Sequence, residues 1–216
     1  MHACGHDAHM AMLLGAARII KELAPDMEGR ILLIFQPSEE KLPGGALPMI
    51  NEGALENNPP DLIIAQHVMP ELPAGTIGFC PGKYMASTDE FYITVKGRGG
   101  HAAMPDQLID SVQIAAQLLV ALQQVSSRMA PPGIPTVLSF GRIEAEGANN
   151  IIPQEVKLYG TFRTLDEEWR DDAHHKIIKL CKTLCESMGA SCEVDIVKGY
   201  PAVNNDPELT GKASSL

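Results

Sequence analysis

Positive charge is scarce in this sequence of 216 residues, because 17 Lys and Arg side chains against 27 Asp and Glu leave a formal net charge of −10. No stretch gathers enough basic side chains to grip a phosphate backbone, which argues against nucleic-acid binding. Every uninterrupted apolar run is too short for a transmembrane helix, and the first residues lack the basic and apolar segments of a secretory leader. We therefore expect neither a nucleic acid nor a membrane as a partner.

The sequence also lacks the features of an exported protein. Its five cysteines are scattered without a paired spacing, and no Asn-x-Ser/Thr site occurs. Both absences indicate a reducing, cytoplasmic setting. Hydrophobic residues make up 45% of the chain and charged residues 20%, which is the composition of a folded globular protein and excludes a disordered one.

Residues 1–84 alternate between helical and strand patterns. Residues 9–23 carry apolar side chains at helical spacing, and residues 47–51 form a shorter helical candidate. Residues 31–35 and 62–65 are continuous apolar runs, which are typical of strands buried on both faces of a parallel sheet. The first segment therefore predicts an α/β domain with part of a parallel sheet.

The pattern changes to α+β in residues 85–200. Alternating strands and two long amphipathic helices follow one another in the order β-α-β-β-α-β, which is the split βαβ (ferredoxin-like) arrangement. The expected strands are 90–96, 136–145, 156–163 and 191–197, and the expected helices are 110–128 and 166–189. The polar residues 201–216 end without a closing element and look like the start of a return to the first domain.

Three polar clusters adjoin the apolar elements of the first segment. Residues 2–9 precede the first helix, residues 36–40 directly follow one expected strand, and residues 66–67 follow the other. In an open α/β sheet, ligands bind in the crevice beyond the carboxyl ends of the strands. We therefore expect the three clusters to surround one crevice.

The side chains of these clusters suit a metal site. On an extended segment Cys4 and His6 would point the same way, and Glu40 and His67 could add a carboxylate and a second imidazole. Sulfur, nitrogen and oxygen ligands of this kind suit zinc, with manganese, cobalt and nickel as alternatives. On an extended pair Glu39 would point away from Glu40, free to act as a general base on water.

Asp7 is a candidate to orient one of the ligands from behind. Each of these residues also has a purely structural interpretation: a cysteine is commonly a small buried hydrophobe, a histidine a satisfied surface or core residue, and a Glu-Glu pair a solvated face. Only their combination at the ends of the expected strands favours a metal site.

The motifs as a set resemble those of a known enzyme family. The order of clusters is matched over nearly the whole chain by the amidohydrolase branch of the aminoacylase/carboxypeptidase dinuclear metallopeptidases. That branch includes hippurate hydrolases, N-acyl-amino-acid amidohydrolases, N-acetyldiaminopimelate deacetylases and indole-acetyl-amino-acid hydrolases. The matching motifs are HACGHDAH at 2–9, QPSEE at 36–40, QH at 66–67, GRGGHAAMP at 97–105, NIIP at 150–153 and GTFR at 160–163.

The resemblance implies a function for the first domain. It implies hydrolysis of the amide bond of a small N-acyl or N-aroyl amino acid by two divalent metal ions, with Glu39 as the general acid/base. The implied protein ligands of this two-metal centre are Cys4, His6, Glu40 and His67.

The resemblance also implies roles for the α+β domain. Residues 85–200 correspond to a lid that is inserted in the catalytic domain, residues 1–84, and that pairs with a second copy to form a homodimer. His101 resembles a histidine that reaches the partner subunit's active site and stabilises the oxyanion. Asn150 and Arg163 resemble lid residues that hold the carboxylate end of the substrate, a contact to which Arg is suited.

The family pattern extends beyond this chain at both ends. Relatives have further strands before the first motif and a C-terminal part that supplies a last metal-binding histidine, so we expect a chain truncated at both ends. One alternative is therefore a catalytically incompetent fragment that acts only as a dimerisation module. Another is a cysteine hydrolase that uses Cys4 with His6 or His67, although Glu39 and Glu40 would then have no role.

Overall fold

The computed structural model describes residues 2–26, 28–57 and 59–216. The chain divides into two compact units, Met1–Gly78 and Phe79–Leu216. Within the described ranges, no helix combines the length and the apolar composition needed to cross a membrane.

The first unit is built from helices and irregular segments. Helix α1 begins three residues earlier than the apolar spacing predicts, because Gly5 at its N-cap takes a φ of +79° and turns the chain directly into the helix. The short helix α2 lies where the sequence predicts one. The elements of this unit are α1 (His6–Leu23), the 3-10 turn η1 (Ala24–Asp26) and α2 (Ala46–Asn51).

The prediction of two buried parallel strands in this unit is wrong. Residues 31–35 and 62–65 belong to no strand, and all but one of their side chains are exposed, Ile31 by 52% and Ile64 by 71%. An apolar strand becomes buried only when neighbouring strands pair with its backbone and helices cover its faces. The described part of the first unit contains no strand, and every strand pair described in the chain is antiparallel.

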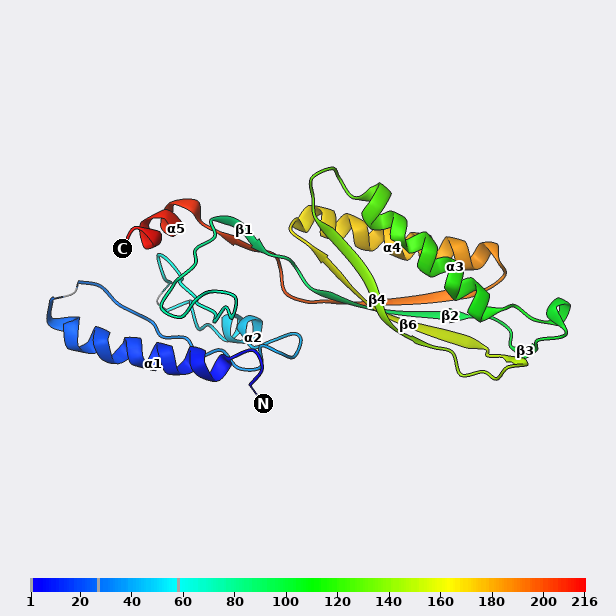
Figure 1. Ribbon diagram of the computed structural model, residues 1–216, viewed down its shortest axis with the longest axis horizontal. Helices are drawn as coiled ribbons and strands as arrows, with labels where there is room; N and C mark the ends of the chain where they lie inside the picture. Colours follow the sequence, from blue (N-terminus) through cyan, green and yellow to red (C-terminus); the bar gives the residue numbers. More distant parts are fainter. Residues whose placement is uncertain (1, 27, 58) are drawn as a thin grey trace. The chain divides into compact units, whose positions relative to one another are not determined.

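The second unit confirms the predicted order of strands and helices, so the chain has a mixed α/β fold. Its main sheet has four antiparallel strands in the order β4-β6-β2-β7, with helices α3 and α4 on one face (Figure 1). The sheet strands are β2 (Asp89–Lys96), β4 (Thr136–Glu144), β6 (Glu155–Thr164) and β7 (Ser191–Lys198), and the helical elements are α3 (Ser111–Gln124), its π-helical extension η3 (Val125–Met129) and α4 (Glu167–Ser187).

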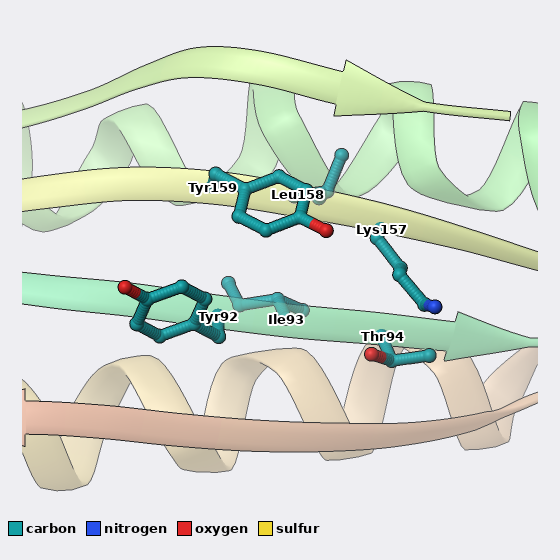
Figure 2. A pocket seen from close by; sticks show the side chains of 6 residues that line it. All are labelled: Tyr92, Ile93, Thr94, Lys157, Leu158 and Tyr159. Atoms are coloured by element: carbon teal, nitrogen blue, oxygen red, sulfur yellow. The ribbon is translucent and has the colours of Figure 1, made fainter.

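Alternation along the strands separates a core face from an open face. On β2 and β6 every second side chain is buried beneath the helices, together with the three cysteines of α4 and β7. Figure 2 shows the open face, with Tyr92 and Tyr159 in front of the strands and the helices behind. The rings of these two residues meet edge to face with centroids 5.8 Å apart. A shallow depression there is lined by Tyr92, Ile93, Thr94, Lys157, Leu158 and Tyr159.

Smaller elements complete the second unit. Residues 201–216, in which the sequence shows no closing element, carry a strand that pairs with β1, followed by a helix. Short polar elements of this kind have too little periodicity to be predicted. The remaining elements are β1 (Gly82–Met85), β3 (Gly100–His101), η2 (Pro105–Gln107), β5 (Ile151–Ile152), β8 (Val203–Asn205) and α5 (Pro207–Ser214). The division into a catalytic part, a lid and a return segment stays a prediction.

A buried polar network holds α4 to the two segments that leave the main sheet, one before β2 and one after β7. The carboxylate of Asp89 accepts hydrogen bonds from Arg170 Nε at 2.9 Å and from the backbone N–H of Gly199 at 3.0 Å. Arg170 also donates to the carbonyl oxygens of Thr88 and Gly199, at 3.2 and 3.0 Å. His174 Nε2 lies 2.7 Å from the same carboxylate. Helix α4 is thus hydrogen-bonded to both segments through Arg170.

Candidate metal centre

Cys4 and His67 meet although neither follows a strand. Cys4 lies in a turn that is closed by a hydrogen bond from the backbone N–H of Gly5 to the carbonyl of His2. Its Sγ lies 3.3 Å from Nε2 of His67. The expected extended geometry of the motif is therefore wrong, because the left-handed backbone of Gly5 places Cys4 in a turn directly before α1.

His6 brings in both glutamates of the second cluster. Its Nε2 lies 3.4 Å from Glu39 Oε2 and 3.9 Å from Glu40 Oε1. The two carboxylates do not point apart as an extended pair would, because Ser38 takes a φ of +54° and the chain turns at once, with Lys41 N donating to the carbonyl of Ser38. After this turn both carboxylates approach the same ring nitrogen of His6.

These contacts form two overlapping groups with the geometry of metal ligands. Cys4, His6 and His67 make one group, and His6, Glu39 and Glu40 make the other; within each, the ligand atoms all lie within 4.8 Å of one another. The donors are one thiol, two imidazoles and two carboxylates, which is the chemistry of a transition-metal site. His6 offers one ligand atom and so binds one ion, and the remaining donors of the two groups are enough to hold a second ion, so the residues fit a two-metal centre.

The surroundings of Cys4 disfavour the thiolate form of its side chain. Partial burial raises its pKa, and the neighbouring charges of Glu40 and Glu39 raise it further. A cation placed among these groups would reverse that balance, because it stabilises the thiolate and both carboxylates at once.

Sequence reasoning missed His9, which lies one helical turn after His6 on α1. Its Nε2 accepts a hydrogen bond from the backbone N–H of Val68 at 3.0 Å. Burial lowers the pKa of His9, the nearby rings of His67 and His6 lower it further, and only the charge of Asp7 opposes them. Asp7 itself is exposed in the first turn of α1. The i, i+3 spacing from His6 was the available signal for His9.

The candidate residues of the second unit fall into two places. His101 and Asn150 lie together, since β3 pairs with β5 and the backbone N–H of Ala102 donates to the carbonyl of Asn150. Both side chains are exposed. Arg163 is exposed near the far end of β6, opposite Val137. The structure therefore brings His101 and Asn150 together and leaves Arg163 apart from them.

The comparison with known sequences decides the family. The sequence profile of the peptidase family M20/M25/M40 matches residues 1–216. The chain belongs to the M20 family. It is 42% identical to the N-acyl-L-amino acid amidohydrolase of Geobacillus stearothermophilus, over 95% of this chain and 55% of the relative. The chain thus spans about half the length of the curated relatives that it matches.

Two solved structures share the fold of this chain. A crystal structure from methicillin-resistant Staphylococcus aureus matches with a TM-score of 0.89 and 32% identity, over 100% of this chain and 57% of that one. A Bacillus subtilis protein described as a dinuclear metal-binding peptidase of the M20 family matches with a TM-score of 0.76 and 30% identity, over 100% of this chain and 54% of that one. Membership of the M20 family confirms the resemblance drawn from the motifs.

Proposed function

We propose that the chain is the metal-binding part of an amidohydrolase that cleaves the amide bond of N-acyl or N-aroyl amino acids. The observation that carries this proposal is the pair of overlapping ligand groups that share His6. The substrate class rests on membership of the M20 family and on the name of the Geobacillus relative.

The proposed ligands of two divalent ions are Cys4, His6, Glu40 and His67. When bound, such ions supply Lewis acidity, which polarises an amide carbonyl and lowers the pKa of water. The mixed sulfur, nitrogen and oxygen donors suit zinc, manganese, cobalt or nickel rather than magnesium or calcium.

Glu39 is the proposed general base. Its carboxylate lies 3.4 Å from His6 Nε2 and is 49% exposed, so it remains accessible to water and substrate. In this role Glu39 accepts the proton that water loses as it attacks the carbonyl carbon, and then delivers that proton to the departing amine.

The residues of the second unit are proposed to act on the substrate. His101 would donate to the oxyanion and Asn150 and Arg163 would bind the substrate carboxylate, with residues 85–200 as a lid that forms a homodimer. The separation of Arg163 from the His101–Asn150 pair supports contributions from two subunits to one site. All five cysteines are free, which supports a cytoplasmic setting.

The test is the metal content of the purified chain after loading with zinc or manganese and dialysis. We expect about two ions per chain, as in two-metal hydrolases. A chain that retains no metal would instead be the non-catalytic dimerisation fragment. Turnover that resists chelators and stops on alkylation would point to the cysteine hydrolase, although the raised pKa of Cys4 disfavours that mechanism.

A substitution at Glu39 separates metal binding from catalysis. Glu39→Gln removes the base but keeps the size and polarity of the side chain, so we expect unchanged retention of the first metal ion and a loss of turnover of about 10²–10⁴-fold on an N-acyl amino acid. Glu56→Gln, at an exposed glutamate of the same unit, is the matched control. Equal turnover of Glu39→Gln and the unaltered chain would remove Glu39 from the mechanism.

A further inference from the structure

His9 connects the first motif to the segment that carries His67. Its Nε2 accepts from the backbone N–H of Val68 at 3.0 Å, in a part-buried position. The carbonyl of Val68 accepts from Nδ1 of His67 at 2.7 Å. The backbone N–H and carbonyl of Val68 thus link the ring of His9 to the ring of His67.

This relay of hydrogen bonds, from His9 through the backbone of Val68 to His67, determines which nitrogen of His67 faces the candidate ligands. A carbonyl oxygen only accepts hydrogen bonds, so Nδ1 of His67 carries the hydrogen and Nε2 keeps its lone pair in the neutral ring. Nε2 is the atom that lies 3.3 Å from Cys4 Sγ. Histidine ligands of metals generally donate their other ring N–H to a carbonyl or carboxylate in this way.

Packing around His9 is close on both sides. The centroid of its ring lies 4.3 Å from that of His67 and 5.4 Å from that of His6. A Cβ added at Gly5 would lie only 2.7 Å from a methyl group of Val68, so the Val68 segment sits tightly on the turn before α1. His9 belongs to neither ligand group found among the described residues, and its Nε2 lone pair is already used.

We propose that His9 is a positioning residue that holds His67 and Val68 against the start of α1 and thereby directs Nε2 of His67 toward the ligand cluster. The relevance of this direction rests on the proposed function. The positioning itself depends only on the hydrogen bonds of the chain and is measurable without metal.

Replacement of His9 by two amide side chains of different length tests the relay. The side-chain oxygen of His9→Gln reaches about as far as Nε2 and can still accept from Val68, whereas that of His9→Asn stops short. Long-range ¹H–¹⁵N spectra of the histidine rings, recorded on the metal-free chain, report the His67 tautomer. We expect the Nδ1–H form in the unaltered chain and in His9→Gln, and a mixture of tautomers in His9→Asn. His175→Asn, at an exposed histidine of α4, is the control.

A titration with Co²⁺ then tests whether the position of His67 affects metal binding. Loss of an outer hydrogen-bond partner typically weakens metal binding about 10–100-fold, so we expect that loss and an altered Co²⁺ absorption spectrum for His9→Asn, with recovery in His9→Gln. An unchanged His67 tautomer in His9→Asn, or equal loss in both variants, would overturn the positioning role. If the tautomer depends on His9 but the unaltered chain binds no Co²⁺, the relay stands and the proposed metal function fails.

Discussion

At the scale of single residues, the candidate ligands meet because two residues take left-handed backbone conformations. Gly5, with a φ of +79°, sets how Cys4 enters the turn before α1. Ser38, with a φ of +54°, turns the chain so that the two carboxylates that follow it both approach His6. The site therefore depends on turns as much as on the ligands themselves.

Gly5→Ala is predicted to disturb this site. A left-handed conformation costs a residue with a Cβ about 1–2 kcal/mol, and the added methyl group would also meet Val68 at 2.7 Å. We expect weaker Co²⁺ binding by about tenfold or more, the usual scale for displaced supporting groups. Gly15→Ala is the control, since Gly15 lies within α1 with open space around its Cα. Equal Co²⁺ affinity in both variants would contradict the prediction.

The sequence was sufficient to name the ligand candidates but not their geometry. Cysteine, histidine and glutamate have chemistry that can be recognised from letters alone. The turn at Ser38 could not be predicted, because a non-glycine residue rarely takes positive φ and its neighbours gave no signal. His9 was missed because its partner, the backbone of Val68, is invisible to an argument from side-chain types.

At the scale of elements, the junction of β2, β7 and α4 depends on the buried carboxylate of Asp89. Burial alone would raise the pKa of Asp89, but hydrogen bonds from His174, Arg170 and the backbone of Gly199 hold it well below the usual range. The folded state thus binds this proton more weakly than the unfolded state. The stability that Asp89 contributes is complete above the unfolded pKa of about 4 and declines as the pH falls below it.

Asp89→Asn is predicted to destabilise the second unit by about 3 kcal/mol at pH 7, because the buried guanidinium of Arg170 loses the charge of Asp89 and keeps only that of the half-exposed Glu167. The difference from the unaltered chain should shrink as the pH falls below about 4. Urea unfolding followed by fluorescence of Trp169, the single tryptophan, measures both effects. Asp172→Asn, at an exposed position on α4, should stay within about 0.5 kcal/mol. A pH-independent difference for Asp89→Asn would count against the argument.

Elements of the second unit were predictable because each carries its own periodic pattern and finds its partners nearby. The spacing of apolar side chains in α4 and the alternation in β2 both match the observed burial. The runs at residues 31–35 and 62–65 have the composition of strands, but a strand also needs a neighbour. Composition reports the tendency of a segment, and pairing is a property of the surrounding chain.

At the scale of the whole molecule, the apolar core is distributed unevenly. Every buried apolar side chain of the described residues lies between Phe91 and Cys192, in the second unit. In the first unit many large apolar side chains are exposed, and α1 buries none of its residues. Resistance to local opening follows buried apolar contact, so the two units should differ in stability.

Limited proteolysis is predicted to cut residues 28–45 and 59–78 first and to leave a fragment close to Phe79–Leu216. Mass spectrometry of the products gives the cleavage sites. Zinc should slow cleavage of the first unit and leave that of the second unchanged, because the proposed ligands all lie in the first. Early cuts within β2, β6 or β7 would contradict this order.

The chain enters and leaves the main sheet at a single point. Thr88 N donates to the carbonyl of Tyr200 at 3.0 Å, and Gly199 N donates to Asp89, so the two ends of residues 86–200 are held one hydrogen bond apart. A segment with adjoining ends can be spliced into a tight turn of another protein without forcing its host open. The four-stranded sheet and its two helices therefore form an insertable unit. Recombination could add this unit to a protein, remove it or exchange it as a whole.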